Sequence, residues 1–279
     1  MRKGICLGLC LALVLLLCAC ADVNLESNST SVPTCEILPA ETVIEDTTAT
    51  ATIEAPEITT EETETTAPAH AALYLPEYTS QQVLEYFEEV VLCTEYSDGT
   101  GNAALVQKWK EPILYSIYGA PTEEDISVLT ALFAQLNEIP GFPGIYARAE
   151  GEPENLMIGF WDSEDFDMYF SEFLNGEDAY GATQYWYYND TNEIYTANVG
   201  YRTDIDQSTR TSVLIEEIIN MLGVSDTVLR TDSIVYQHSN DNTALSDMDW
   251  LILKLLYHPA MQCGTDFDGC RTVIEDLYY

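Results

Sequence analysis

A change of composition near residue 72 limits how much of this chain can fold around a core. Between Ala21 and Ala72 the sequence contains no lysine or arginine, and its threonine, glutamate, alanine and proline leave room for few large apolar side chains. Such a segment buries too little apolar surface to offset the entropy of ordering, and its charges repel one another. We therefore expect residues 20–72 to form a disordered acidic Thr/Glu-rich stalk with a reach on the order of 40 Å.

The N-terminal residues have the pattern of an export signal. A short basic region precedes an uninterrupted apolar run, which at about a dozen residues is shorter than the roughly 20 that span a bilayer. The run ends in "LCAC", residues 17–20, which resembles the bacterial lipobox. This resemblance implies a signal peptide at residues 1–19, lipid on Cys20 and a location on the extracytoplasmic face of the cell membrane. Ordinary cleavage near Ala21 is the alternative.

The charge of the chain limits its partners. The formal net charge is −37, from 47 acidic and 10 basic residues. A surface that binds nucleic acid needs a basic patch, so nucleic acid is excluded as a partner. The partners that remain are the membrane, through the N-terminal lipid, and a peptide or envelope protein. No cofactor is predicted, although the charge is compatible with a divalent cation such as calcium.

Residues 73–279 are rich in tyrosine, leucine, isoleucine and tryptophan, and about 200 residues suffice for one well-buried domain. Three capping boxes predict helix starts, at Thr79 with Gln82, Thr122 with Asp125 and Ser246 with Asp249. Further patterns predict strands at 110–119, 144–150 and 155–161, a helix or irregular lobe at 163–174, a hairpin turning near 189–192, and a helix at 207–222 capped by Gly223. This order of elements predicts an α+β fold.

The helix within "RTSVLIEEIINMLGVSD", residues 210–226, resembles the active-site helix of zincin metalloproteases. In H-E-x-x-H the two histidines share one helix face and bind one zinc, and the glutamate acts as base on the zinc-bound water. In this chain Glu216 and Asn220 stand at the histidine positions, Glu217 at the base position and Asp226 at the position of a third ligand.

Downstream patterns extend the resemblance. "SIVY", residues 233–236, looks like the S-I-M-Y turn beneath the metal, and "LSDMDWLILKLLY", residues 245–257, matches the closing helix. The combination of E-E-x-x-N-x-L-G with these motifs is similar to the bacterial domain-of-unknown-function family 2927, over residues 78–264. The resemblance implies a zincin-like domain with a mixed β-sheet, a backing helix, a degenerate active-site helix and C-terminal helices.

The histidines decide the chemistry that remains open. Only His70, His238 and His258 are present, and no two are four residues apart. A two-imidazole zinc site on this helix is therefore excluded, and with it proteolysis by the usual route. Our leading hypothesis is a non-catalytic binding or scaffolding module at the cell surface. The alternative is an atypical metal-dependent hydrolase or peptidase that uses Glu217 as general base.

Three interpretations of Glu216 and Glu217 remain open. They form a solvated helix face, or a buried pair that shares one proton. In the third interpretation Glu216, Glu217, Asn220 and Asp226 bind a hard cation through oxygen. "DFDG", residues 266–269, is a further weak indication of calcium.

Cysteine and aromatic residues add three expectations. Cys263 and Cys270 enclose a glycine-containing loop and predict a disulfide outside the cytosol, whereas Cys93 is expected as a buried helical thiol. The aromatic run at residues 184–188 either lines a peptide groove, as an edge strand does in zincins, or forms a half-buried hairpin. His258 suits a helix end, where its charge would complement the dipole.

Overall fold

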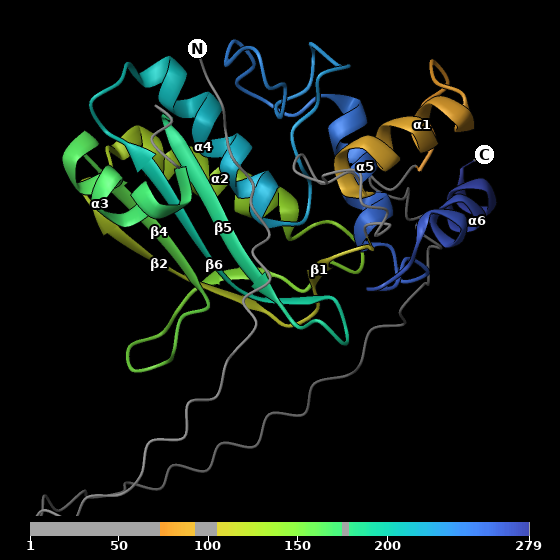
Figure 1. Cartoon of the computed structure of the whole chain (residues 1–279), viewed down its shortest axis with the longest axis horizontal. Coiled ribbons are helices and arrows are strands. Elements are labelled where there is room, and N and C mark those ends of the chain that lie inside the picture. The colour runs from red at the N-terminus through yellow and green to blue at the C-terminus, as the bar shows by residue number, and fades with distance from the viewer. Residues whose placement is uncertain (1–72, 93–104, 175–178, 279) are drawn as a thin grey trace, which may run out of the picture. The chain divides into compact units, whose positions relative to one another are not determined.

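The computed structural model of the chain describes residues 73–92, 105–174 and 179–278 (Figure 1). The predicted signal peptide and stalk, with Cys20 and Cys35, lie outside these residues, and so does Cys93. The elements are α1 (Ser80–Phe87), η2 (Glu88–Leu92, a π-helical turn), β1 (Lys108–Trp109), β2 (Ile113–Gly119), α2 (Glu123–Leu136), β3 (Ile145–Ala147), β4 (Leu156–Trp161), α3 (Ser163–Leu174), β5 (Gly181–Tyr187), β6 (Glu193–Arg202), α4 (Gln207–Met221), α5 (Asp247–Tyr257) and α6 (Phe267–Leu277). None of the helices in these ranges has the length and apolar character needed to cross a bilayer.

Six strands form one mixed sheet. The order is β1-β6-β4-β2-β3 with parallel neighbours, and β5 pairs with β6 in the antiparallel direction. Parallel neighbours need a crossover, which α2 supplies between β2 and β3. The domain is therefore a mixed α/β domain, and the mixed β-sheet that the resemblance implied is confirmed. The predicted hairpin is confirmed, and its turn contains Asn192 at a φ of 58°.

The two faces of the sheet are covered by different helices. Gly200 of β6 lies against Phe170 of α3, whereas the hydroxyl of its neighbour Tyr201 donates a hydrogen bond to the carbonyl of Leu214 in α4. Because successive strand residues point to opposite faces, α3 and α4 cover opposite sides. Helix α4 also packs against α2 and β5, so it lies within the main core.

The predicted helix starts are confirmed, and one helix was missed. All three capping boxes form, at Thr79, Thr122 and Ser246. The bounds of helix α6 were not predicted, because Cys263 and Cys270 were expected to enclose a glycine-containing loop. Asp266 instead caps the helix, its side chain accepting a hydrogen bond from the Gly269 backbone N–H.

The disulfide predicted between Cys263 and Cys270 is not formed in this structure. Both residues are free thiols. The sulfur of Cys263 faces the carbonyl of Lys108, and that of Cys270, buried in the first turns of α6, faces the carbonyl of Thr265. The two sulfur atoms therefore face different carbonyl groups.

Candidate functional site

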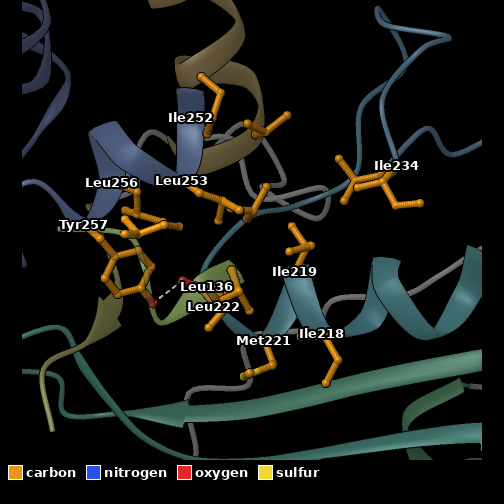
Figure 2. Close-up of a cluster of buried hydrophobic side chains, with 14 of the residues drawn as sticks. Leu136, Ile218, Ile219, Met221, Leu222, Ile234, Ile252, Leu253, Leu256 and Tyr257 are labelled. Carbon is orange, nitrogen blue, oxygen red and sulfur yellow. Dashed lines mark hydrogen bonds between the residues drawn. The ribbon is translucent and has the colours of Figure 1, made fainter. Parts of the chain in front are cut away.

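Helix α4 carries the candidate site, and its polar residues are buried. The exposed fractions are 5% for Glu216 and 1% each for Glu217 and Asn220. These values exclude the interpretation of a solvated helix face. The apolar C-terminal turn of the helix reaches α5, where the hydroxyl of Tyr257 meets the carbonyl of Leu222 (Figure 2).

Glu217 lies directly over β5. Its side chain is so close to Gly181 that a Cβ there would come within 2.9 Å of its Oε1 atom. Burial raises the pKa of Glu217 from 4.5 to about 8; the negative charge of Asp226 adds to the rise, and Thr183 opposes it. The Thr183 hydroxyl also donates a 2.8 Å hydrogen bond to the main-chain carbonyl of Glu217. Glu217 is therefore largely protonated at neutral pH.

Glu216 points to a different partner. Its Oε2 atom accepts a 2.9 Å hydrogen bond from the side-chain amide of Asn240, itself buried in the loop before α5. The charge that raises the pKa of Glu217 belongs to Asp226. Charge coupling at this site therefore involves the third-ligand position, whereas we expected it between the two adjacent glutamates.

Asn220 holds the segment that follows α4. Its Nδ2 atom donates a 3.0 Å hydrogen bond to Oδ1 of Asp226. Within the described residues, Oδ1 of Asn220 and Oε2 of Glu217 have no hydrogen-bond partner. These two residues are three positions apart on one helix, where side chains are neighbours. A proton on Oε2 of Glu217 would make this atom a hydrogen-bond donor, and Oδ1 of Asn220 would be its acceptor.

The hard-cation interpretation gains no support from this geometry. Nowhere in residues 73–92, 105–174 and 179–278 do three or more histidine, cysteine, aspartate or glutamate side chains gather as a metal group. Glu216 and Asp226 each accept from a side-chain amide. The donor set does not fit zinc either, because no imidazole or thiolate accompanies these carboxylates.

Two aromatic side chains complete the C-terminal end of α4. The indole N–H of Trp109 donates to the carbonyl of Met221 at 2.9 Å, and the hydroxyl of Tyr257 donates to the carbonyl of Leu222 at 3.0 Å. The second bond is the dashed line in Figure 2. These carbonyls belong to the last turn, where a helix has no internal donors. Gly223 follows with a φ of +95°, as expected for its C-terminal cap.

The turn at residues 233–236 is held by the closing helix. Asp249 accepts hydrogen bonds from the Ser233 hydroxyl at 2.7 Å and from the backbone N–H groups of Ile234 and Ser246. The hydroxyl of Tyr86 lies 3.0 Å from the same carboxylate. The two motifs that were recognised in the sequence therefore form one buried network, with a structural role.

Some polar residues of the core were missed. Lys108 in β1 is buried, and its ammonium donates to the carbonyls of Leu256 and Met261 at the end of α5. Burial lowers its pKa to about 8. A lone lysine in a short segment gives no sequence signal of burial, because its partners are main-chain carbonyls about 150 positions away.

The two histidines of the domain have structural surroundings. His258 ends α5, and its Nδ1 atom accepts a hydrogen bond from the Ala260 N–H. Burial and the charge of Lys108 lower its pKa, so the neutral ring is favoured over the charged ring that we expected. His238 is exposed, and its ring packs edge-on against Tyr236.

The fold and the site define a class of protein: a mixed α/β domain whose central helix carries buried acids that are bonded internally. The chain belongs to the family of proteins of unknown function DUF2927, which it matches over residues 80–276. This confirms the family predicted from the motifs. No curated protein matches the chain.

Proposed function

We propose that this chain is a non-catalytic binding or scaffolding module with a zincin-like domain. The proposal depends on one observation: the three helix positions that a zincin uses for chemistry are buried here. Glu216, Glu217 and Asn220 are each at least 95% buried, and Glu216 and Asn220 are bonded to loop side chains. A general base needs contact with the water or substrate whose proton it removes. These positions instead stabilise the protein interior.

The arrangement of elements supports a zincin-like ancestry. The sheet is mixed, β5 is its antiparallel edge, α2 backs α4, and the turn at residues 233–236 leads to the closing helix α5. Each of these features is implied by the motifs around α4. We infer that the architecture of a peptidase is retained with its metal chemistry replaced by hydrogen bonds.

The surface that we propose for binding is the open edge of β5. Within the described residues this strand pairs only with β6. An edge strand offers unpaired backbone groups to an extended peptide. The half-buried side chains of Gln184, Tyr185, Trp186 and Tyr187 lie along it, and aromatic side chains of this kind give contact area with a polar tip. The class of partner is thus an extended segment of an envelope protein.

We also propose that the module is held at the extracytoplasmic face of the cell membrane by lipid on Cys20. The lipobox-like residues 17–20 and the acidic segment up to residue 72 support this location. Several acyl chains on one cysteine give stable anchoring, whereas one chain does not.

Metal content and peptide cleavage test the function. The purified protein should contain no stoichiometric transition metal or calcium, and it should leave a mixed peptide library intact. The Glu217→Gln variant should behave identically. Bound metal at one equivalent, together with cleavage that this variant abolishes, would establish the hydrolase instead.

One observation favours that rival function. A glutamate with a pKa near 8 is a suitable general base or acid at neutral pH. To act in this way, Glu217 would need access to water. The hydrogen bond between Glu216 and Asn240 would have to break to admit it. An Asn240→Ala variant that gains cleavage activity would reveal such a latent site.

A further inference from the structure

The pairing of β6 is interrupted along one of its edges. Strand β1 ends its pairing at Ile194, and β4 begins its pairing at Ala197. Both strands lie on the edge of β6 opposite β5, because β5 pairs with the same two residues from the other side. Tyr195 and Thr196 therefore fall in a gap between β1 and β4.

A pocket of about 210 Å³ lies at this gap. Its walls come from residues 109–111 at the end of β1, from Asn155 just before β4, and from the β5–β6 hairpin with Tyr188, Glu193, Ile194 and Tyr195. The pocket is on the far side of β6 from the open edge of β5. It is therefore a separate place from the surface proposed above for a peptide.

Hydrogen bonds within the protein hold the walls of the pocket. The side chain of Asn155 accepts from the Leu114 N–H at 2.6 Å and donates to the carbonyl of Pro112 at 3.0 Å. On the hairpin, the N–H of Tyr188 donates to the carbonyl of Glu193 at 3.0 Å. The pocket is thus formed before any ligand arrives, which lowers the entropy cost of binding.

Tyrosine side chains give the pocket an aromatic wall. The rings of Tyr188 and Tyr195 stack, with their centroids 4.5 Å apart and an interplanar angle of 27°. Nevertheless, 52% of Tyr188 and 40% of Tyr195 remain exposed. The buried indole of Trp109 adds a third ring to the lining. Stacked rings lose little further side-chain entropy on binding, so they favour a ligand with a flat apolar face.

An ion pair supplies the polar groups. Nζ of Lys110 lies 2.6 Å from Oε1 of Glu193, and both side chains are partly exposed. An ammonium has three donors and a carboxylate has two acceptor oxygens, so the pair can bond a ligand while it stays intact. Glu111 adds a second carboxylate to the lining. One ammonium against two carboxylates disfavours an anion, and the ammonium of Lys110 opposes a cation.

A neutral sugar ring meets both requirements. Its C–H groups form an apolar face, and each of its hydroxyls both donates and accepts. The volume of about 210 Å³ lies below the roughly 300 to 1,000 Å³ of pockets for drug-sized ligands, so one ring fits. We propose that this pocket binds a single ring of a neutral polysaccharide. The apolar face of the ring lies on the Tyr188–Tyr195 pair, and its hydroxyls bond to the Lys110–Glu193 pair.

Affinity electrophoresis of the full-length chain in detergent tests the proposal. Native gels contain hydroxyethyl cellulose, galactomannan or soluble starch as neutral polymers, or polygalacturonate as an anionic one. The repeated units of a polymer raise the effective concentration of a weak ligand. At least one neutral polymer should retard the protein relative to a gel without polymer, and polygalacturonate should not.

Matched variants separate the pocket from the rest of the surface. Tyr188→Ala should weaken the affinity by about fivefold or more, whereas Tyr188→Phe keeps the ring and should keep the affinity. Lys110→Gln should weaken it by about threefold or more. The control is Tyr146→Ala, which should have no effect, because Tyr146 of β3 has the same exposed fraction of 52% and does not line the pocket.

Three outcomes would overturn the proposal. They are the absence of retardation in every neutral polymer, equal effects of Tyr188→Ala and Tyr146→Ala, and retardation by polygalacturonate alone, which would assign the pocket to an anion. None of these results alters metal content or peptide cleavage, so the proposed function is judged separately.

Discussion

Asp125 of α2 and Arg210 of α4 form a buried ion pair with two hydrogen bonds, Nη2 to Oδ2 at 2.6 Å and Nε to Oδ1 at 3.0 Å. The same carboxylate completes the capping box of Thr122 and accepts from Gln207. Burial alone would raise the pKa of Asp125, but these donors, led by Arg210, bring it below its usual value. One carboxylate thus joins the first turns of two helices.

We predict that Asp125→Asn destabilises the domain by about 3 to 5 kcal/mol, because Arg210 would remain buried without its counter-charge. Urea unfolding measures the change. The control is Lys110→Gln, which removes the exposed Lys110–Glu193 pair and should change the free energy of unfolding by no more than about 1 kcal/mol. Similar losses of unfolding free energy in both variants would contradict the view that burial makes the Asp125–Arg210 pair important.

Glu217→Gln should change the pH dependence of stability. Folding raises the pKa of Glu217 from 4.5 to about 8, so the folded state binds more protons between these values. The contribution of Glu217 to the free energy of unfolding is therefore full below pH 4.5. It falls as the pH rises toward 8, by at most about 1.4 kcal/mol per pH unit. Glutamine cannot ionise, so the variant should lose less stability over this window. Parallel curves for the two proteins from pH 5 to 8.5 would show that Glu217 is not buried as described.

Gly223→Ala should be strongly destabilising. Its φ is +95°, and a Cβ would meet the carbonyl oxygen of Gln107 at 2.2 Å. Gly151 is the matched control, since its φ is +85° and a Cβ there meets no atom within 4 Å. Gly151→Ala should cost about 1 to 2 kcal/mol from backbone strain alone, and Gly223→Ala about 2 kcal/mol more. Calorimetric unfolding of both variants measures the difference, which should vanish if the contact with Gln107 is absent.

Cys20→Ser should release the protein from membranes. The wild-type protein should incorporate radiolabelled palmitate, and this variant should not. The reason is that the lipobox-like motif assigns the acyl group to this one thiol. Cys35→Ser, a cysteine in the same N-terminal region, should keep its label and remain in the membrane fraction. Label retained by the Cys20→Ser variant would place the acyl group on another residue, and absence of label from the wild-type protein would exclude the anchor.

Local patterns in the sequence predicted much of the fold. The capping boxes and the cap at Gly223 depend on residues within a few positions of one another, and they are confirmed. Strand pairing depends on residues far apart in the chain. The alternation in residues 110–119 therefore predicted a strand but could not show that its neighbours would be parallel, so the order of the strands was not predicted.

The candidate site was predictable in its residues but not in its contacts. Spacing alone placed Glu216, Glu217 and Asn220 on one helix. Their partners come from elements distant in sequence: Asn240 for Glu216, and Gly181 and Thr183 for Glu217. Burial separates the three interpretations that the sequence left open, and burial is set by the whole tertiary packing.

The bonds at the end of α4 have a consequence for how the molecule forms. Trp109 lies 112 positions before Met221 along the chain, and Tyr257 lies 35 positions after Leu222. The last carbonyls of α4 receive their donors only after β1 and α5 have both packed against the helix. Contacts between residues so far apart in the chain form slowly. A nascent chain still lacking α5 has no Tyr257 donor for the carbonyl of Leu222, so this domain should become resistant to proteases only after α5 has been synthesised.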